Sequence, residues 1–276
     1  MTLLNNALKN VLKKFHSLEF ISSEISIFVE NILSFIRFKK HKFIYKKELG
    51  IFLVTEKTQQ VRFLNKIRGF NLYRNGIKKR ADFIFSSYCL DKISFSEDDV
   101  VIDCGANFGD LMLKLKDYIK PKNYVAIEPN PSDFAVLRLN YNDSILTNKA
   151  LGSVNTYGEF YVSTEEGGSS LVKPISFTEI INSSIITLDT LIQELNLKKI
   201  KLLKIEAEGY EPEVLSGLSE IMLKKINYIA IDGGYERGVE KKQTFTNLTN
   251  KLIQNNFEIV DIKFDFNRAL FLNKKF

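Results

Sequence analysis

Cysteine and long apolar runs are scarce in this sequence of 276 residues. The two cysteines, Cys89 and Cys104, are too few for a disulfide framework, a four-cysteine zinc site or an iron–sulfur cluster held by three or four cysteines. So few cysteines are typical of a reducing compartment, and we expect a cytoplasmic protein. The most apolar N-terminal run, ISIFVENILSFIRF, contains Glu30 and Asn31 and is too short to span a bilayer. We expect no signal peptide, because no small-residue cleavage site is evident.

Charge is distributed unevenly along the chain. Residues 1–80 hold 17 Lys and Arg against 5 Asp and Glu, whereas the remaining residues hold 22 against 28. We therefore predict a basic, mainly helical N-terminal extension at 1–80 and a mildly acidic domain at 81–276. Within the extension, the apolar pattern predicts helices at 1–18 and 22–38, a hairpin over 42–54 and mainly helical structure over 57–92.

After residue 92 the pattern alternates between short apolar runs and helical periodicity. Such alternation predicts a mostly parallel sheet with helices on both faces, and the last two runs lack an intervening helix, so they predict a C-terminal antiparallel hairpin. The predicted strands are 99–104, 123–128, 145–151, 200–206, 228–232, 257–264 and 268–273, and the predicted helices are 108–119, 131–141, 187–196, 211–224 and 241–255.

The stretch VVIDCGANFGD, residues 100–110, predicts a buried strand that ends in a glycine loop and opens a helix. Ligands of open α/β sheets bind beyond the carboxyl ends of the strands, so this loop predicts a binding site. Its spacing is not the G-x-G-x-x-G of dinucleotide-binding loops, because Asn107 occupies the second glycine position. The lysine of a phosphate-binding P-loop is absent as well.

Two acids point to a ligand without phosphate. Asp103 precedes the loop, where it would repel a pyrophosphate but suit an amino or sulfonium group. Glu128 ends the second strand, where an acid accepts hydrogen bonds from both ribose hydroxyls of an adenosine. S-adenosylmethionine combines these groups. Taken singly, Asp103 could instead cap a helix and Glu128 could be a solvated strand end.

Several stretches resemble the FkbM family of S-adenosylmethionine-dependent methyltransferases. They lie between about residues 97 and 273, and the run at 203–217 is the most specific of them. The family carries an Asp in that run where this sequence has Glu206, which keeps the charge but lengthens the arm. The matching stretches are VVIDCGANFGD, VAIEPNPSDFAVLRLN, NKALG, ITLDTLIQEL, LLKIEAEGYEPEVLSG and NRALF.

The resemblance implies a class I methyltransferase fold, Rossmann-like, with a mostly parallel seven-stranded sheet. It also implies methyl transfer to oxygen, often on sugars or natural-product hydroxyls. Asn148 and Ala150 end the third predicted strand, where the adenine would rest. The full predicted cofactor-binding set is Asp103, Gly105, Ala106, Asn107, Gly109, Glu128, Pro129, Asn148 and Ala150.

The predicted catalytic residues, Lys204, Glu206 and Glu208, alternate along the end of the fourth strand and so share one face. An acid here could accept the hydroxyl proton or position the acceptor oxygen, and Lys204 could stabilise a developing alkoxide. The alternative is structural: a Lys204–acid pair, with Glu208 capping the next helix. Asp232 could complete a divalent metal site with both glutamates, but we predict no metal, since no histidine lies in this half.

Other segments leave their roles open. The loop at 163–171 could close over the cofactor or form a surface turn. His16 and His41 are more typical of core or surface than of catalysis. The extension at 1–80 could pack on the sheet, pair with another subunit, or dock on an anionic membrane or acidic glycan. A nucleic-acid methyltransferase is disfavoured, because no Asn-Pro-Pro-aromatic motif is present, and a non-catalytic binding module is disfavoured by the intact Asp103–Glu128 pair.

Overall fold

The computed structural model describes residues 10–18, 21–163 and 168–276. The chain divides into two compact units, one up to Ala81 and one from Asp82 to the C-terminus. Each unit is described by itself below. Residues 1–9, which belong to the first predicted helix, and residues 164–167 of the predicted loop at 163–171 lie outside the described residues.

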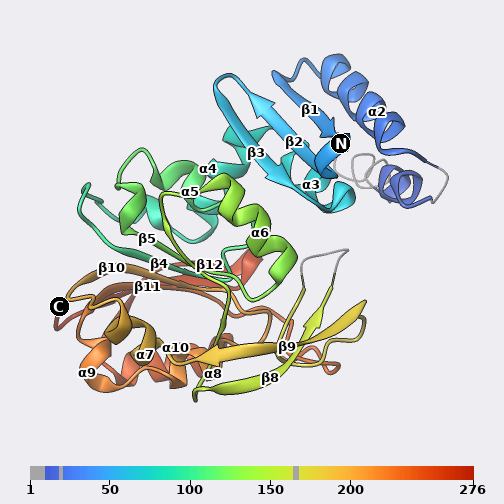
Figure 1. The fold of residues 1–276 in the computed structure, drawn as a ribbon. Helices are drawn as coiled ribbons and strands as arrows, with labels where there is room; N and C mark the ends of the chain where they lie inside the picture. Colours follow the sequence, from blue (N-terminus) through green and yellow to red (C-terminus); the bar gives the residue numbers. More distant parts are fainter. Residues whose placement is uncertain (1–9, 19–20, 164–167) are drawn as a thin grey trace. The chain divides into compact units, whose positions relative to one another are not determined.

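The first unit combines helices with a three-stranded antiparallel sheet of order β1-β2-β3 (Figure 1). The predicted hairpin is confirmed, since β1 and β2 pair antiparallel around Gly50, whose φ of 63° suits glycine. The helical prediction over 57–92 is wrong at its start, because β3 extends the sheet there. Residues 10–16 are helical. The further elements are α2 (Ser23–Ile36), β1 (His41–Lys46), η1 (Lys47–Leu49), β2 (Ile51–Glu56), β3 (Gln59–Phe63), α3 (Lys66–Tyr73) and α4 (Ile77–Ser87), which crosses the division.

The second unit is built on a seven-stranded sheet of order β12-β13-β11-β10-β4-β5-β6. Every neighbouring pair from β6 to β11 is parallel, whereas β13 runs antiparallel to both of its neighbours. This arrangement confirms the predicted class I methyltransferase fold and its C-terminal hairpin. The strands are β4 (Val101–Cys104), β5 (Tyr124–Ile127), β6 (Ile145–Thr147), β10 (Ile200–Ile205), β11 (Ile226–Asp232), β12 (Phe257–Lys263) and β13 (Arg268–Asn273).

Helices cover both faces of this sheet (Figure 1). Successive strand residues point to opposite faces, so Ile102 joins the apolar cluster formed with α7, α8, α9 and α10, whereas Val101 joins the cluster formed with α4, α5 and α6. The helical elements are η2 (Leu90–Lys92), α5 (Met112–Leu115), η3 (Pro121–Asn123), α6 (Pro131–Asn140), α7 (Leu188–Glu194), α8 (Glu211–Ser216), α9 (Glu220–Leu223), α10 (Phe245–Gln254) and η4 (Phe264–Phe266).

Two predicted elements are divided. The strand expected at 145–151 becomes β6 and then β7 (Ala150–Leu151), which pairs with β9 (Glu179–Ile186) in a separate sheet that also contains β8 (Thr156–Val162). The helix expected at 211–224 ends at Gly217 and restarts as α9. A Cβ on Gly217 would lie 2.1 Å from the carbonyl oxygen of Gly152, so backbone contact at this point requires glycine.

Candidate functional site

The carboxyl ends of β4, β5, β10 and β11 lie at one edge of the large sheet, where α/β proteins bind their ligands. Because β13 is antiparallel, its first residue reaches the same edge, and Arg268 is in register with Asp232 at the end of β11. The described side chains at this edge carry most of the buried charge of the unit.

Five of these side chains alternate in sign, and we call them the charge row: Asp103, Lys204, Glu206, Arg268 and Asp232. The ammonium nitrogen of Lys204 lies 2.9 Å from Asp103 Oδ1 and 2.8 Å from Glu206 Oε2. Arg268 Nη2 lies 3.1 Å from Glu206 Oε1, and its Nε donates to Asp232 Oδ2 at 2.6 Å. Each inner member therefore pairs with two opposite charges, which compensates for the loss of water around it.

The charge row fixes the ionisation of its central members. Burial opposes the charge of Lys204, but Asp103 and Glu206 outweigh burial and raise the lysine pKa. Burial also opposes the charge of Glu206, but Lys204 and Arg268 outweigh it and hold the pKa of this carboxyl well below its usual range. Glu206 is thus a permanent carboxylate, and a quarter of its side chain remains exposed.

Lys204 is held firmly. Besides the two carboxylates, its ammonium group donates to the carbonyl oxygens of Cys104 and Gly105 at 3.3 and 3.1 Å. With Asp103 1% exposed and also accepting from the Tyr124 hydroxyl, the lysine–acid pair of the structural alternative is present. Direct contact between Asp103 and a ligand amino group stays a prediction.

Sequence reasoning did not identify Arg268 as a site residue. Its side chain is 12% exposed, its Nη1 donates to the Ser87 hydroxyl at 2.7 Å, and its guanidinium carbon lies 4.2 Å from the centroid of the Tyr88 ring. The ring of Tyr88 is also 5.5 Å from the Lys204 nitrogen. The sequence signal for Arg268 is the stretch NRALF, which begins the second strand of the predicted terminal hairpin.

Glu128 joins two loops at the carboxyl end of β5. Its Oε2 accepts from the backbone amide of Asn107 and its Oε1 from that of Asn130, both at 2.9 Å. The carboxylate is 6% exposed. A carboxylate offers several acceptor positions, and contact of this one with the two hydroxyls of a ribose stays a prediction. The alternative of a solvated strand end does not describe this buried, oriented group.

The glycines of the first loop serve close packing within the protein. Gly105 has a φ of 74°, and a Cβ there would lie 2.0 Å from the carbonyl oxygen of Glu206. Gly109 has a φ of 87°, and a Cβ there would lie 2.2 Å from the Tyr141 ring. Gly105 thereby lets the loop after β4 approach the loop after β10. Ala106 between them is buried and donates its amide to Ile127.

Asn148 is exposed, and its side-chain amide donates to the carbonyl oxygens of Glu128 and Pro129 at 2.8 and 3.1 Å. It therefore braces the loop after β5 at the point where the predicted third strand divides. Pro129 is partly buried and Ala150 is 4% exposed, within β7. Contact of these three residues with an adenine stays a prediction.

Glu208 differs from Glu206 in its surroundings. Burial, then the carboxylates of Glu236 and Glu206, raise its pKa well above the ordinary value. Its φ of 50° is unusual for a residue other than glycine, asparagine or aspartate, and strain of this kind is common at functional sites. The capping role is not observed, because no side chain caps α8; instead Glu211 accepts from the amides of Ala207 and Gly209.

The described part of the loop at 163–171 reaches this glutamate. Ser170 is 2% exposed, and its hydroxyl donates to the carbonyl oxygen of Glu208 at 2.9 Å. The Ser170 hydroxyl thus links the β8–β9 connection to the backbone after β10.

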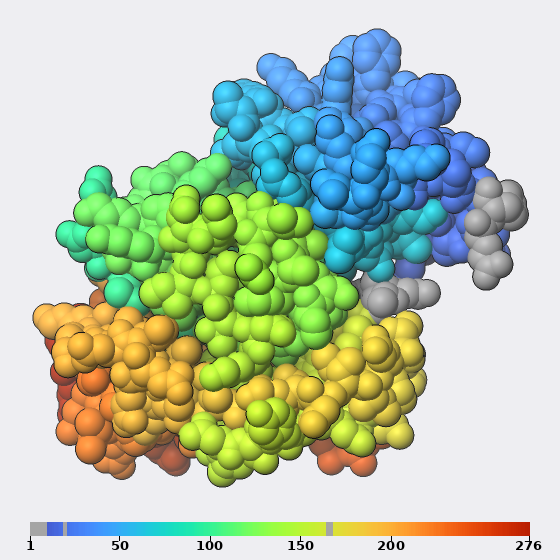
Figure 2. Space-filling model, in the orientation of Figure 1, coloured from blue at the N-terminus to red at the C-terminus, as the bar shows by residue number. Residues whose placement is uncertain are grey.

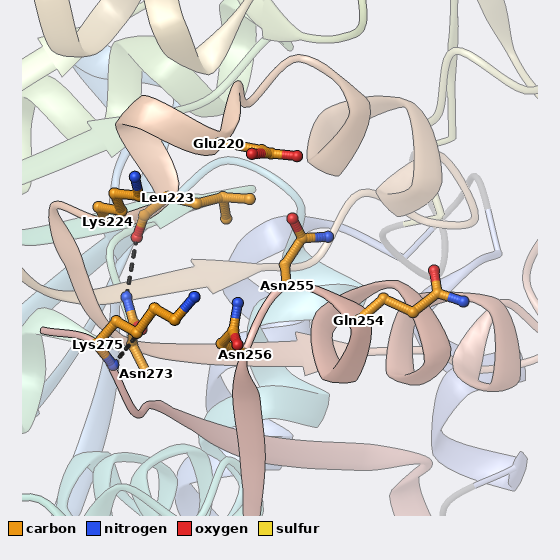
Figure 3. A pocket seen from close by; sticks show the side chains of 8 residues that line it. All are labelled: Glu220, Leu223, Lys224, Gln254, Asn255, Asn256, Asn273 and Lys275. Atoms are coloured by element: carbon orange, nitrogen blue, oxygen red, sulfur yellow. Dashed lines mark hydrogen bonds between the residues drawn. The ribbon is translucent and has the colours of Figure 1, made fainter.

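A separate hollow of about 150 Å³ lies at the opposite edge of the sheet, where β13 ends (Figure 3). Asn273 lines the hollow, and its side-chain amide is fixed by bonds to the carbonyl oxygens of Leu223 and Ile226. The hollow is polar and distant along β13 from Arg268, so we do not assign it to the candidate site. It is lined by Glu220, Leu223, Lys224, Gln254, Asn255, Asn256, Asn273 and Lys275.

In residues 10–18, 21–163 and 168–276, no three His, Cys, Asp or Glu side chains are grouped as a metal ion would require. Glu206 and Asp232, two members of the metal set considered from sequence, share Arg268 as their partner. In the same described residues, no helix is long and apolar enough to cross a bilayer.

Comparison with known proteins relates the chain to methyltransferases. The model of the methyltransferase FkbM domain matches residues 103–259. "Methyltransferase 1" of Beauveria bassiana is 24% identical over 59% of this chain and 78% of its own length, and "Methyltransferase sdnD" of Sordaria araneosa is 25% identical over 56% and 74%. The crystal structure of a methyltransferase FkbM from Methylobacillus flagellatus is 17% identical with a TM-score of 0.44, over 66% of this chain and 45% of that one.

Proposed function

Because the chain belongs to the methyltransferase FkbM domain family, we propose that it transfers a methyl group from S-adenosylmethionine to a hydroxyl oxygen of a saccharide, a glycan precursor or another hydroxylated small molecule. The observation that carries the oxygen acceptor is the pair Glu206 and Glu208, whose pKa values are shifted in opposite directions at one edge of the sheet. When bound, S-adenosylmethionine supplies an electrophilic methyl group on a cationic sulfur.

The residues present fit this cofactor. Glu128 is buried and oriented by two backbone amides, which suits two ribose hydroxyls. Gly105, Asn107 and the braced loop after β5 form the backbone around that carboxylate. The charge row has one more negative than positive member, and an additional cation is attracted to such an edge.

The acceptor hydroxyl must lose its proton during transfer to oxygen. Glu208 is suited to receive that proton, because its raised pKa makes its carboxylate a better base than an ordinary glutamate. Glu206 stays ionised between Lys204 and Arg268, so it is suited to accept a hydrogen bond from the hydroxyl and to orient it. Lys204 is committed to Asp103 and Glu206, and its charge stabilises a developing alkoxide from nearby.

The test supplies the protein with methyl-labelled S-adenosylmethionine and separate pools of saccharides and RNA. We expect label in the carbohydrate pool as an ether, stable to mild base, and its loss in Glu208→Gln but not in Glu159→Gln, an exposed glutamate on β8. In calorimetry, Glu128→Gln should weaken cofactor binding about 30-fold, or about 2 kcal/mol, because charge-assisted bonds are lost.

The outcomes separate the alternatives. Label in RNA would identify a nucleic-acid methyltransferase, and cofactor binding without transfer to either pool would favour a binding module. Unchanged cofactor affinity in Glu128→Gln would remove Glu128 from the cofactor site. Activity that a chelator abolishes and magnesium restores would instead favour the metal alternative.

A further inference from the structure

Helix α2 of the first unit buries a row of polar side chains. Ser26, Glu30 and Ser34 recur every four residues and are 0%, 1% and 5% exposed. Glu30 Oε1 lies 3.0 Å from His16 Nε2, and the hydroxyl of Ser34 lies 3.0 Å from His41 Nε2. Both histidines of the chain are therefore buried partners of this helix, as the core interpretation of them predicts.

The helix lies along the open edge of β1. The side chain of Asn31 accepts from the amide of Phe43 at 2.8 Å and donates to the carbonyl oxygen of the same residue at 2.9 Å. These two bonds replace those of a neighbouring strand, so α2 covers an edge that would otherwise be unpaired. Its orientation is fixed by this pair and by the buried polar contacts.

The opposite side of α2 is an exposed apolar stripe. Its members follow helical spacing within an arc of about 100°, and the centre of that arc lies on the side of the helix opposite Glu30. In Figure 2 the blue segment that contains α2 lies at the surface of its unit. The stripe consists of Ile25, Phe28, Ile32, Phe35 and Ile36, which are 46%, 66%, 41%, 81% and 62% exposed. A contiguous apolar surface of this kind marks an interaction site.

Phe38 extends the stripe beyond the helix end. Its side chain is 94% exposed, and its φ of 52° places it in the left-handed region. That conformation ends α2, because it lets the amide of Lys39 donate to the carbonyl oxygen of Ser34 at 2.9 Å, as in a helix C-terminal cap. The cap therefore leaves a large apolar side chain pointing into solvent at the end of the stripe.

Cations follow the stripe directly. Residues 37–47 contain six Lys and Arg and no Asp or Glu. Lys39, Lys40 and Lys42 are exposed. We propose that this face of α2, with Phe38 and the cations at 37–42, docks on a bilayer of anionic phospholipid, the helix lying flat with its apolar stripe among the acyl chains. A helix of 14 residues is about 21 Å long, which suits a position in the interface rather than across the membrane.

The charge pattern favours lipid over a second copy of this chain. A symmetric pair through α2 would place a second cation cluster at the same interface, and each copy would offer Glu24 as the exposed carboxylate of the helix. An anionic bilayer offers both an apolar interior for the stripe and negative headgroups for Lys39 and Lys40. The inference is independent of the proposed methyl transfer.

The chain contains no tryptophan, so a single introduced tryptophan reports on its own surroundings. We would compare Phe38→Trp with Ile221→Trp, a matched control on α9 whose native side chain is 70% exposed. Both full-length proteins are titrated with phosphatidylcholine vesicles and with phosphatidylcholine–phosphatidylglycerol vesicles. We expect a blue shift and reduced iodide quenching for Trp at 38 with anionic vesicles, weakened by high salt, and no change at 221.

Two further variants test the two components of the surface. Lys39→Gln/Lys40→Gln should weaken binding about 30-fold, at about 1 kcal/mol for each lysine near an anionic surface. Phe35→Ser should remove an apolar anchor while leaving the circular dichroism unchanged, since its side chain is 81% exposed. No spectral shift with anionic vesicles, or equal binding to neutral ones, would overturn the proposal. A shift that depends on protein concentration without vesicles, with doubled mass in light scattering, would assign the face to a second copy.

Discussion

Arg268 offers the sharpest test of the charge row. Replacing it with methionine removes the cation shared by Glu206 and Asp232 while keeping an apolar stem over the Tyr88 ring. Asp232 is 4% exposed and loses its cation, whereas Glu206 keeps Lys204. Removing one partner of a buried ion pair costs about 3–5 kcal/mol, and we expect Arg268→Met to lower the free energy of unfolding by that amount.

A double-mutant cycle separates the buried charge from the lost packing. Asp232→Asn keeps an acceptor for the amide of Gly234 and removes the charge. Combined with Arg268→Met, it should recover about 2 kcal/mol or more of the loss, because no unpaired carboxylate remains at that position. Urea denaturation of the four proteins, with equal slopes, gives the coupling energy.

A matched control is the pair Arg237–Glu213, which is 2.6 Å long but only partly buried. Arg237 makes two bonds to Glu213 and one to the carbonyl oxygen of Gly209, but its side chain is one-third exposed, so Arg237→Met should cost less than Arg268→Met, about 1–2 kcal/mol. Equal losses in Arg268→Met and Arg237→Met, or simple additivity of Arg268→Met with Asp232→Asn, would refute the argument that burial and charge sharing determine the effect.

Two further predictions concern titration. Turnover should rise with pH through the raised pKa of Glu208, since its carboxylate must be ionised to accept a proton. Residual turnover of Glu208→Gln should lack this rise, whereas Glu206→Gln should lower turnover and move the rise to lower pH, because the charge of Glu206 helps to raise the Glu208 pKa. A retained rise in Glu208→Gln would exclude it as the proton acceptor. Burial raises the pKa of Glu211 to about 7, so its contribution to stability is present below the unfolded value and is lost as pH rises toward 7. Relative to Glu211→Gln, wild-type stability should therefore fall by up to about 1.4 kcal/mol per pH unit between roughly pH 5 and 7 and then level off, as urea denaturation at several pH values would show, and parallel profiles would contradict this.

The sequence predicts the first strand, its glycine loop and Glu128 because these features are local. The buried apolar run, the two glycines and the acid at the end of the next strand lie within about 30 residues of one another, so the local pattern is enough to predict them. Arg268 depends instead on long-range topology. It lies 62 residues after Glu206, and it reaches that carboxylate because β13 enters the sheet antiparallel beside β11.

The sequence prediction omits β8 and β9, although both strands have a local signal. β9 contains EIINSSII and β8 contains TYGEFYV, and both are rich in strand-forming residues. The division of the strand expected at 145–151 had no such signal, and it coincides with the long-range bonds of Asn148 to the carbonyl oxygens of Glu128 and Pro129. The mistaken helix at 59–63 reflects a five-residue strand that is stabilised mainly by pairing with β2.

Glu206 and Glu208 are two residues apart, so the sequence places both carboxyl groups on one face of an extended segment and gives no reason to assign them different roles. Their neighbours make them different. Lys204 and Arg268 surround Glu206 and keep it ionised, whereas Glu236 and Glu206 itself raise the pKa of Glu208. Where two carboxyls of one site are driven apart in this way, the group with the raised pKa is suited to proton transfer and the other to electrostatic positioning. In this chain the Glu206 carboxylate bridges Lys204 and Arg268, and the proposed methyl transfer assigns the proton to Glu208.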